Sequence, residues 1–352
     1  MEMETNTGKA KNWLVIWLLA GVIMVFVQIM LGGVTRLTGS GLSITRWEIV
    51  TGAIPPMNAG EWEIEFGRYK QTPQYRQINE GMDLAEFKYI FFWEYFHRLW
   101  ARSMGFVFLI PFLYFLWVKA ISRTTMVRLA IVVSLAALAA VFGWIMVSSG
   151  LKDRPWVNAY KLTVHLSLGI SLFLSLWYTW VKEKGISVFP VSPGWKRAIK
   201  VLIILTVVQI CFGGFVSGMK SALNYPTWPL MQGEYIPSLI FDSSHWSIDS
   251  LLLYDQSGFM PAFVQFIHRN LAYLISILVV IFSVQWVRKQ DRQTHWMAWL
   301  LVGIIVVQVL LGILTLLGSK GSIPVLYGSL HQGIGIIFLT TLIYIHIRSK
   351  ST

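Results

Sequence analysis

Four of the seven histidines lie in apolar stretches, at positions that repeat between the two halves of the chain: His97, His165, His268 and His331. The segments around them match in pairs, with EYFHR at 94–98 and QFIHR at 265–269, then HLSLG at 165–169 and HQGIG at 331–335. Ionisable side chains are costly inside lipid and usually mark a functional site. Imidazoles from two facing helices can bind a haem iron from both sides. The pattern therefore predicts two haem sites, each held by two histidines.

Other interpretations explain less of this pattern. A single histidine in a membrane helix is often a hydrogen-bonded packing residue, but that does not account for four at matched positions. Tetrahedral zinc prefers three or four close protein ligands, and neither half offers them. The other histidines are expected to have surface roles, because His245 lies in a polar connection and His295 and His346 lie at helix ends.

The two halves differ three residues before the first histidine, where Glu94 precedes His97 but Gln265 precedes His268. Residues three apart share a helix face, so the carboxylate is expected beside the histidine. A carboxylate there can accept or deliver protons next to a reacting group. Two structural alternatives stay open, a helix N-terminal acid and an ion pair with Arg98. The difference predicts chemistry in the first half and a resident redox centre in the second.

Three arginines lie just inside the same helices as these histidines: Arg98, Arg102 and Arg269. A guanidinium can bind a haem propionate through two parallel hydrogen bonds. Long cationic side chains also extend to the water boundary of a membrane without any ligand. The sequence leaves both roles open.

The composition is that of an integral membrane protein. Of 352 residues, 55% are hydrophobic and 13% charged, with a mean hydropathy of +0.59. A span needs about 20 apolar residues. Such runs occur at roughly 13–34, 96–118, 127–149, 160–181, 197–218, 265–287, 296–317 and 326–347. The sequence predicts an all-α protein with eight transmembrane helices.

An internal repeat divides the chain into residues 1–182 and 183–352. VQIMLGG at 27–33 matches VQICFGG at 208–214, in addition to the histidine segments. An even number of helices in each repeat inserts both halves in the same orientation. We therefore expect two tandem four-helix bundles related by a pseudo-twofold axis along the membrane normal.

Charge predicts the orientation in the membrane. The short connections and both terminal segments are rich in Lys and Arg, which the positive-inside rule assigns to the cytoplasm. The histidines are then expected near the outer face, under two long connections that cap it. The net charge is +12, but the Lys and Arg residues form no basic run of the kind that binds nucleic acid. A cell inner membrane protein with cytoplasmic termini follows, although the sequence does not decide between a bacterial and an organellar host.

Taken together, these segments resemble the haem A synthase family, in the branch that includes the mitochondrial enzyme. The resemblance spans nearly the whole chain and is carried by TRLTGSGLS at 35–43, VTGAIPP at 50–56, EYFHR at 94–98, YKLTVH at 160–165, NYPTWPLM at 224–231, FIHR at 266–269, QVLLG at 308–312 and LHQ at 330–332. Loop cysteines found in another branch are absent, since the single cysteine, Cys211, lies within a predicted span.

The resemblance implies that the C8 methyl of haem O is converted to the formyl of haem A by two successive hydroxylations and loss of water. It implies that His268 and His331 hold a haem b cofactor through its iron, and that His97 and His165 present the substrate haem O. Glu94 matches the functional acid of the family.

The resemblance also implies partners. Besides membrane lipid, these are haem O synthase, as the source of substrate, and an electron donor that the sequence does not identify, and the oligomeric state is equally open. Two other functions compete. A dihaem b-type electron-transfer protein would explain the histidines but not the difference between Glu94 and Gln265. A transporter with parallel repeats would need a midplane ion site, and none is evident.

Overall fold

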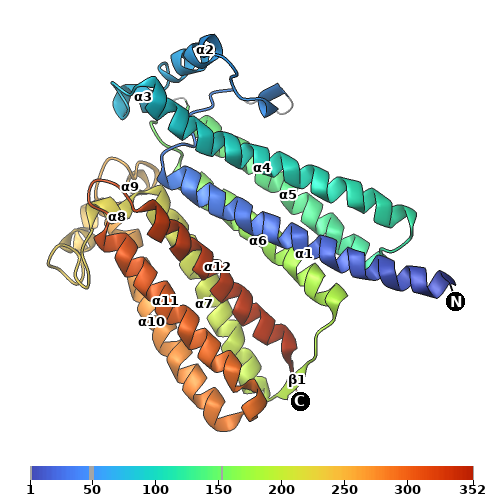
Figure 1. The fold of residues 1–352 in the computed structure, drawn as a ribbon. Helices are drawn as coiled ribbons and strands as arrows, with labels where there is room; N and C mark the ends of the chain where they lie inside the picture. Colours follow the sequence, from blue (N-terminus) through green and yellow to red (C-terminus); the bar gives the residue numbers. More distant parts are fainter. Residues whose placement is uncertain (1, 47–50, 152–153, 352) are drawn as a thin grey trace. The chain divides into compact units, whose positions relative to one another are not determined.

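The computed structural model describes the whole chain except residues 1, 47–50, 152–153 and 352. It confirms the all-α fold with eight apolar helices long enough to cross a membrane (Figure 1). They are α1 (Glu2–Leu37), α4 (Leu84–Trp117), α5 (Arg123–Gly150), α6 (Ala159–Lys184), α7 (Pro193–Gly218), α10 (Phe259–Lys289), α11 (His295–Leu317) and α12 (Val325–Arg348). In lipid, a helix satisfies its backbone polar groups internally, which explains this choice of structure.

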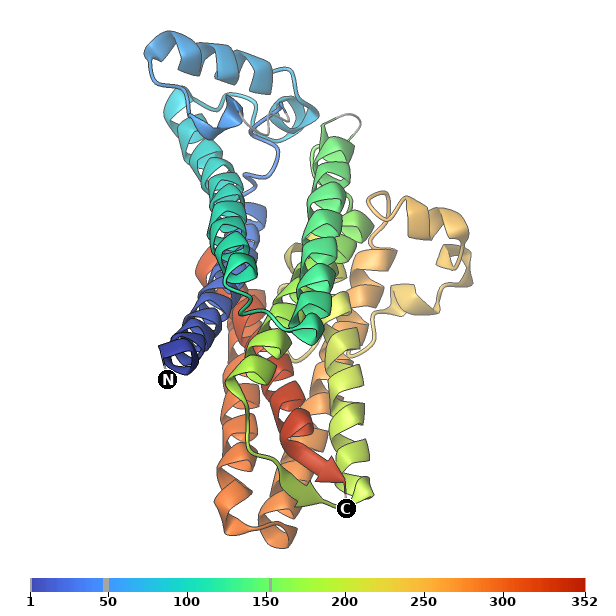
Figure 2. The same ribbon diagram turned by 90° about the vertical axis from the view of Figure 1, so that its right-hand side faces the viewer.

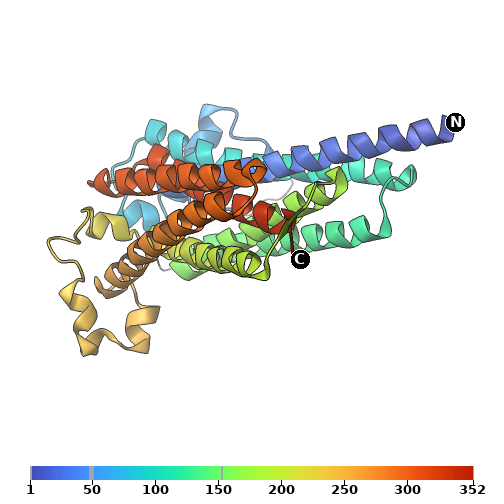
Figure 3. The same cartoon turned by 90° about the horizontal axis from the view of Figure 1, so that it is seen from below.

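The chain forms two compact units, Met1–Ile186 and Ser187–Thr352. In the first unit, α1 packs against both α4 and α6, and α6 packs against α5. In the second unit, α7 packs against α10 and α12, and α11 packs against α10 and α12, so the four helices close into a ring. Figure 3 shows the same helices from below. Each unit has a loop end, where the long connections lie, and a turn end, where the helices are joined by short turns.

Aromatic contacts hold α1 in place in the first unit. The Trp17 indole donates a hydrogen bond to the Val107 carbonyl at 2.9 Å, and its ring lies 5.3 Å from Phe108. On the opposite side, Phe26 lies 5.9 Å from Phe173 of α6. α1 therefore lies between α4 and α6 and packs against both.

The second unit has an extensive apolar core towards its turn end. Trp286 is its largest buried side chain; its ring lies 5.1 Å from Trp195, and its indole donates to the Thr294 hydroxyl at 3.0 Å. A short parallel pair, β1 (Phe189–Val191) with β2 (Ser349–Ser351), closes this end. The core comprises Val191, Ile199, Leu202, Ile275, Val279, Phe282, Trp286, Met297, Ala298, Leu301, Ile305, Phe338, Leu342 and Ile345.

Two of the spans begin earlier than hydropathy predicts. Asp83 and Glu86 form a capping box that starts α4 at Leu84, 13 residues before His97. In the second unit, α10 starts at Phe259, nine residues before His268. The predicted runs place every histidine within two turns of the start of its helix, and this placement is wrong for His97 and His268. It holds for α6 and α12, which start six residues before their histidines.

The long connections fold into small structures on the loop end of each unit (Figures 1 and 2). The first contains η1 (Thr51–Ala53), α2 (Ala59–Tyr69) and α3 (Pro73–Gln77). The second contains α8 (Ser221–Asn224), η2 (Ser238–Phe241), η3 (Ser243–His245) and α9 (Ile248–Leu252). At the turn end, η4 (Arg292–Thr294) leads into α11.

An aromatic cluster attaches α2 to the start of α4. Its buried members are Phe66, Tyr69, Phe87, Ile90 and Phe91. Tyr69 is fully buried, and its hydroxyl donates to Gln74 at 3.0 Å and accepts from Asn79 at 2.7 Å. Burial raises the pKa of Tyr69 to about 12, so its phenol stays neutral and can keep both bonds. The cluster explains why α4 extends well beyond its apolar run.

Replacing Phe87 by Ala should detach this cluster while leaving the spans intact. A fully buried aromatic lost from a core costs about 3–5 kcal/mol. Amide hydrogen exchange over residues 59–83 should therefore accelerate strongly, with no change in the protection of α5 or α6. Phe92→Ala on the same helix is the control, because Phe92 is 52% exposed. Equal acceleration in both variants would contradict the role given to Phe87.

Candidate histidine centres

In the first unit, each predicted histidine packs its ring against a glycine of the preceding span. His97 of α4 faces Gly32 of α1, where an added Cβ would lie 3.2 Å from the imidazole Cε1. His165 of α6 faces Gly143 of α5, with a corresponding distance of 3.0 Å. Both separations are tighter than ordinary van der Waals contact, so the glycines make room for the rings.

The second unit repeats the arrangement. An added Cβ at Gly213 of α7 would lie 3.2 Å from Cε1 of His268, and one at Gly312 of α11 would lie 2.8 Å from Cε1 of His331. The chain thus contains four copies of one local device, a histidine set against a glycine of the preceding span. Copies three and four lie in the same order as copies one and two.

Backbone carbonyls fix the tautomer of two of these rings. His165 Nδ1 lies 2.9 Å from the Ala139 carbonyl, and His331 Nδ1 lies 3.0 Å from the Gln308 carbonyl. A carbonyl only accepts, so Nδ1 carries the proton in each ring. Nε2 then keeps its lone pair, as in metal-binding histidines, which usually donate their other ring N–H to a carbonyl or carboxylate.

Three glutamines lie close to Nε2 of three of the four rings. They were not identified from the sequence. Gln28 Nε2 lies 3.2 Å from His97 Nε2, and Gln209 Nε2 lies 3.3 Å from His268 Nε2. The amide N–H is the donor, so these imidazoles also present an unprotonated Nε2.

The third glutamine, Gln308, completes a sequence pattern by which all three could have been identified. Gln308 Nε2 lies 3.5 Å from His331 Nε2. Each glutamine stands four residues before the glycine that faces its histidine, giving the pattern Q-x-x-x-G in α1, α7 and α11. The copy at His165 has Ala139 at this position, so the first unit has one amide where the second has two.

The spacing of the two rings in the second unit suits a metal between them. The ring centroids of His268 and His331 are 6.3 Å apart, with an interplanar angle of 72°. Imidazole nitrogen binds a transition metal at roughly 2 Å, so two ligands on opposite faces place their ring centres about 6 Å apart. Within the described residues, no group of three or more His, Cys, Asp or Glu could hold a metal ion. A planar cofactor that leaves two axial positions open fits this donor set.

Glu94 is buried beside the first of these histidines and binds the chain that follows α1. It is 2% exposed. Its carboxylate accepts from the Ser43 hydroxyl at 2.7 Å and from the Ile44 amide at 2.8 Å. Arg98 completes the site with an ion pair at 2.5 Å and also donates to the Ile44 carbonyl at 3.2 Å. The ion pair considered as an alternative role for Glu94 is therefore present, and Ser43 joins the site as a residue not singled out before.

The second unit anchors the corresponding loop with a neutral residue. Gln265 donates to the Tyr225 carbonyl at 2.9 Å. Arg269 donates to the Pro229 carbonyl at 2.5 Å and to the Thr227 carbonyl at 3.4 Å. Both units thus share one loop anchor, which is formed by Glu94 and Arg98 in the first unit. In the second unit, it is formed by Gln265 and Arg269. Only the first version contains a carboxylate.

The remaining candidate residues lie elsewhere. His245 is in the second long connection, 3.7 Å from Asp242, whose pKa is held below its usual value by hydrogen bonds from Ser244. His295 contacts the Gln290 carbonyl at the turn end, where His346 also lies. Arg102 is half-buried one turn beyond Arg98. Among the glycines that the structure describes, none packs against His245, His295 or His346 as four do against the predicted ligands.

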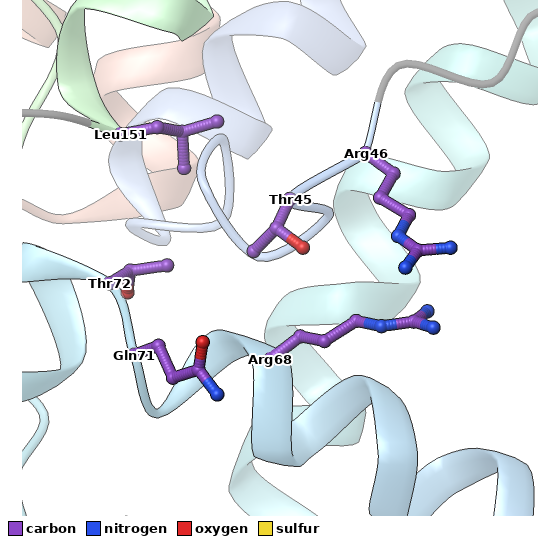
Figure 4. Close-up of a pocket in the computed structure, with 6 residues that line it drawn as sticks. All are labelled: Thr45, Arg46, Arg68, Gln71, Thr72 and Leu151. Atoms are coloured by element: carbon purple, nitrogen blue, oxygen red, sulfur yellow. The ribbon is translucent and has the colours of Figure 1, made fainter.

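A polar pocket lies at the loop end of the first unit, apart from the histidines (Figure 4). The guanidinium groups of Arg46 and Arg68 extend in the same direction along its wall. Arg68 also forms an ion pair with Glu65. The lining residues are Thr45, Arg46, Arg68, Gln71, Thr72 and Leu151.

Comparisons with known proteins agree on one family. A family model described as "Cytochrome oxidase assembly protein" matches residues 15–343. A "Heme A synthase" of Nitrosospira multiformis is 37% identical over 339 residues, which cover 94% of this chain and 92% of that protein. Proteins of the same name from Brucella ovis and Brucella abortus are each 38% identical over 328 residues, covering 92% of this chain and 88% of theirs.

Replacing Arg269 by Ala should release the second loop. A hydrogen bond from a charged group contributes roughly 1.5–3 kcal/mol, and the substitution removes two. Amide hydrogen exchange over residues 225–232 should accelerate at least tenfold, while the spans stay protected. Arg292→Ala, an exposed arginine of the turn end, is the control. Unchanged exchange in Arg269→Ala would show that other contacts hold the loop.

Proposed function

Because the chain belongs to the family of cytochrome oxidase assembly proteins, we propose that it is a haem A synthase. The reaction converts the C8 methyl group of haem O to the formyl group of haem A. Two successive hydroxylations give a gem-diol, which loses water. The observation that carries the proposal is the fourfold histidine and glycine device within a chain that matches relatives of this name over more than nine tenths of its length.

His268 and His331 are proposed to hold a haem b cofactor in the second unit. Their centroid separation of 6.3 Å suits an iron between two imidazoles. The carbonyl of Gln308 and the amide of Gln209 leave Nε2 of both rings unprotonated. The bound haem supplies the redox chemistry, and the protein supplies position and tuning.

His97 and His165 are proposed to present the substrate haem O in the first unit. Their rings sit on Gly32 and Gly143 just as the other pair sits on its glycines. This division gives residues 1–182 the substrate role and residues 183–352 the cofactor role.

Glu94 is proposed to be the acid–base residue of the reaction. It lies three residues before His97 on the same helix and is almost fully buried. Gln265 holds the equivalent loop but has no ionisable proton. A carboxylate replaces an amide only in the unit assigned to substrate, which supports a role in proton transfer beyond anchoring Ser43 and Ile44.

The protein is proposed to reside in the cell inner membrane with both termini in the cytoplasm. The short turns and the terminal segments are rich in basic residues and would face the cytoplasm by the positive-inside rule, which counts short connections and not long ones. The loop ends, and with them the haem sites, would face outward. Haem O would come from a haem O synthase, and the electrons from a donor still to be identified.

The proposal is tested by expressing the protein in cells that make haem O but cannot make haem A. Total haem extracts should contain haem A with the wild-type chain and only haem O with Glu94→Gln, because losing a general acid–base group costs about 10²–10⁴ in rate. Glu80→Gln, an exposed acid of the same loop end, should behave as wild type. A b-type spectrum without any haem A in the wild type would favour the dihaem electron-transfer protein. Full activity of Glu94→Gln would show that Glu94 anchors the loop and takes no part in proton transfer.

Replacing His268 or His331 by Ala should remove the cofactor. Each variant would lose one of the two histidines proposed to hold the haem, so the low-spin b-type absorption of the purified protein should disappear or become high-spin. His245→Ala, outside the spans, is the control. An unchanged Soret band in both ligand variants would refute their assignment as haem ligands.

A further inference from the structure

The second long connection turns large apolar side chains outward between η2 and α10. Single exposed hydrophobic residues are normal on any protein, but here they are concentrated within residues 241–253. Phe241 is 71% exposed, Ile248 73% and Leu252 59%. Such a concentration typically marks a site of contact with a protein or a membrane. The residues that form this outward patch are Phe241, Trp246, Ile248, Leu251, Leu252 and Leu253.

The orientation of α9 accounts for much of this exposure. Ile248, Leu251 and Leu252 stand at positions i, i+3 and i+4, so they share one helix face. In a loop helix surrounded by water, an apolar face packs inward. Here all three side chains are exposed, whereas Ser250 of the opposite face is half-buried. α9 thus presents its apolar face to the surroundings.

Contacts with α10 keep the outward patch in place. The Trp246 ring lies 5.2 Å from that of Phe259 and 5.3 Å from that of Phe263. Its indole donates a hydrogen bond to the Ile240 carbonyl at 2.9 Å. On the other side of α9, Tyr254 is fully buried. The patch is therefore carried by a segment that is held at both ends.

The same contacts set the depth of the patch. α10 has 31 residues, which at 1.5 Å per residue make about 46 Å, whereas a hydrocarbon core is roughly 30 Å thick. Dividing the surplus of about 16 Å evenly leaves about five residues of each helix end in a headgroup layer. At the loop end, these residues include Phe259 and Phe263. Because Trp246 is held against both rings, the patch lies at headgroup level, where tryptophan is enriched.

Position and charge favour lipid over a protein as the occupant. Figures 2 and 3 show the segment, in tan, projecting to one side of the second unit. A segment that projects sideways from membrane spans at headgroup depth meets lipid. Residues 221–268 contain four acidic residues and no Lys or Arg. Attraction to the bilayer would therefore come from apolar burial and would not depend on anionic headgroups.

We propose that the outward patch is a membrane anchor, which docks into the boundary between headgroups and acyl chains in the leaflet at the loop end. Docking would bury the apolar face of α9, which is favourable in proportion to the area removed from water. Asp249, on the other face, would stay in water. The anchor would hold the second half of the connection, whose first half is held by Gln265 and Arg269. It is independent of haem chemistry.

The test compares the two faces of α9 in full-length protein reconstituted in nanodiscs of neutral phosphatidylcholine. Leu252→Cys and Asp249→Cys each receive a nitroxide spin label in a Cys211→Ala background, since Cys211 is the single native cysteine. Electron paramagnetic resonance measures how often each label collides with O₂, which dissolves in lipid, and with a water-soluble nickel chelate. Interfacial helices bury their apolar face about 5–10 Å deep, so the O₂-to-nickel ratio should be at least about threefold higher at residue 252 than at residue 249.

Adding anionic phosphatidylglycerol should leave the ratio at residue 252 unchanged. Equal ratios at the two positions would overturn the anchor. A ratio at residue 252 that is high in native membranes but low in nanodiscs would also overturn it, because another protein would then cover the patch.

A second variant does not depend on the label. Ile248→Asn places an uncharged polar group on the apolar face. In nanodiscs, amide hydrogen exchange over residues 247–253 should accelerate at least about tenfold, because the variant loses one apolar side chain from the lipid. Asp249→Asn changes the polar face and is the control, with exchange as in the wild type. Exchange as in the wild type for Ile248→Asn as well would show that this side chain lies in water, and the anchor would be refuted.

Discussion

The contact of an imidazole ring with a glycine Cα is the constraint on which the rest of the structure depends. It occurs four times, and at Gly312 an added Cβ would approach His331 to 2.8 Å. Because no side chain intervenes, the ring is held between two helices and its nitrogens meet fixed backbone and amide partners. The orientation of each predicted ligand is therefore set by the helix pair and not by a flexible loop.

The loop anchors show how one geometry carries two chemistries. In both units, a residue one turn before an arginine binds the chain that leaves the first span, and the arginine binds loop carbonyls. Gln265 does so as a donor, whereas Glu94 does so as an acceptor, which reverses the direction of its hydrogen bonds. A duplicated scaffold can thus keep its loop in place while one copy acquires a carboxylate.

Hydropathy was sufficient to predict the eight spans, because lipid permits few structures other than helices. It placed the starts of α4 and α10 too late. Their first turns, Leu84 to Trp93 and Phe259 to Val264, pack against the loop structures and lie before the predicted apolar runs. The histidine pairs were visible as a repeat, and their role as ligands stays a prediction. The three glutamines were not found, although each stands four residues before a glycine, because the sequence alone did not show that these glycines face the histidines.

The missing amide at Ala139 separates His165 from the other three histidines. In His97, His268 and His331, a glutamine N–H lies against Nε2. Among the described residues, no glutamine contacts that atom in His165, whose ring is oriented through Nδ1 by the Ala139 carbonyl. If the four imidazoles hold haem iron as proposed, His165 would be the one that gives up no glutamine hydrogen bond when the metal binds.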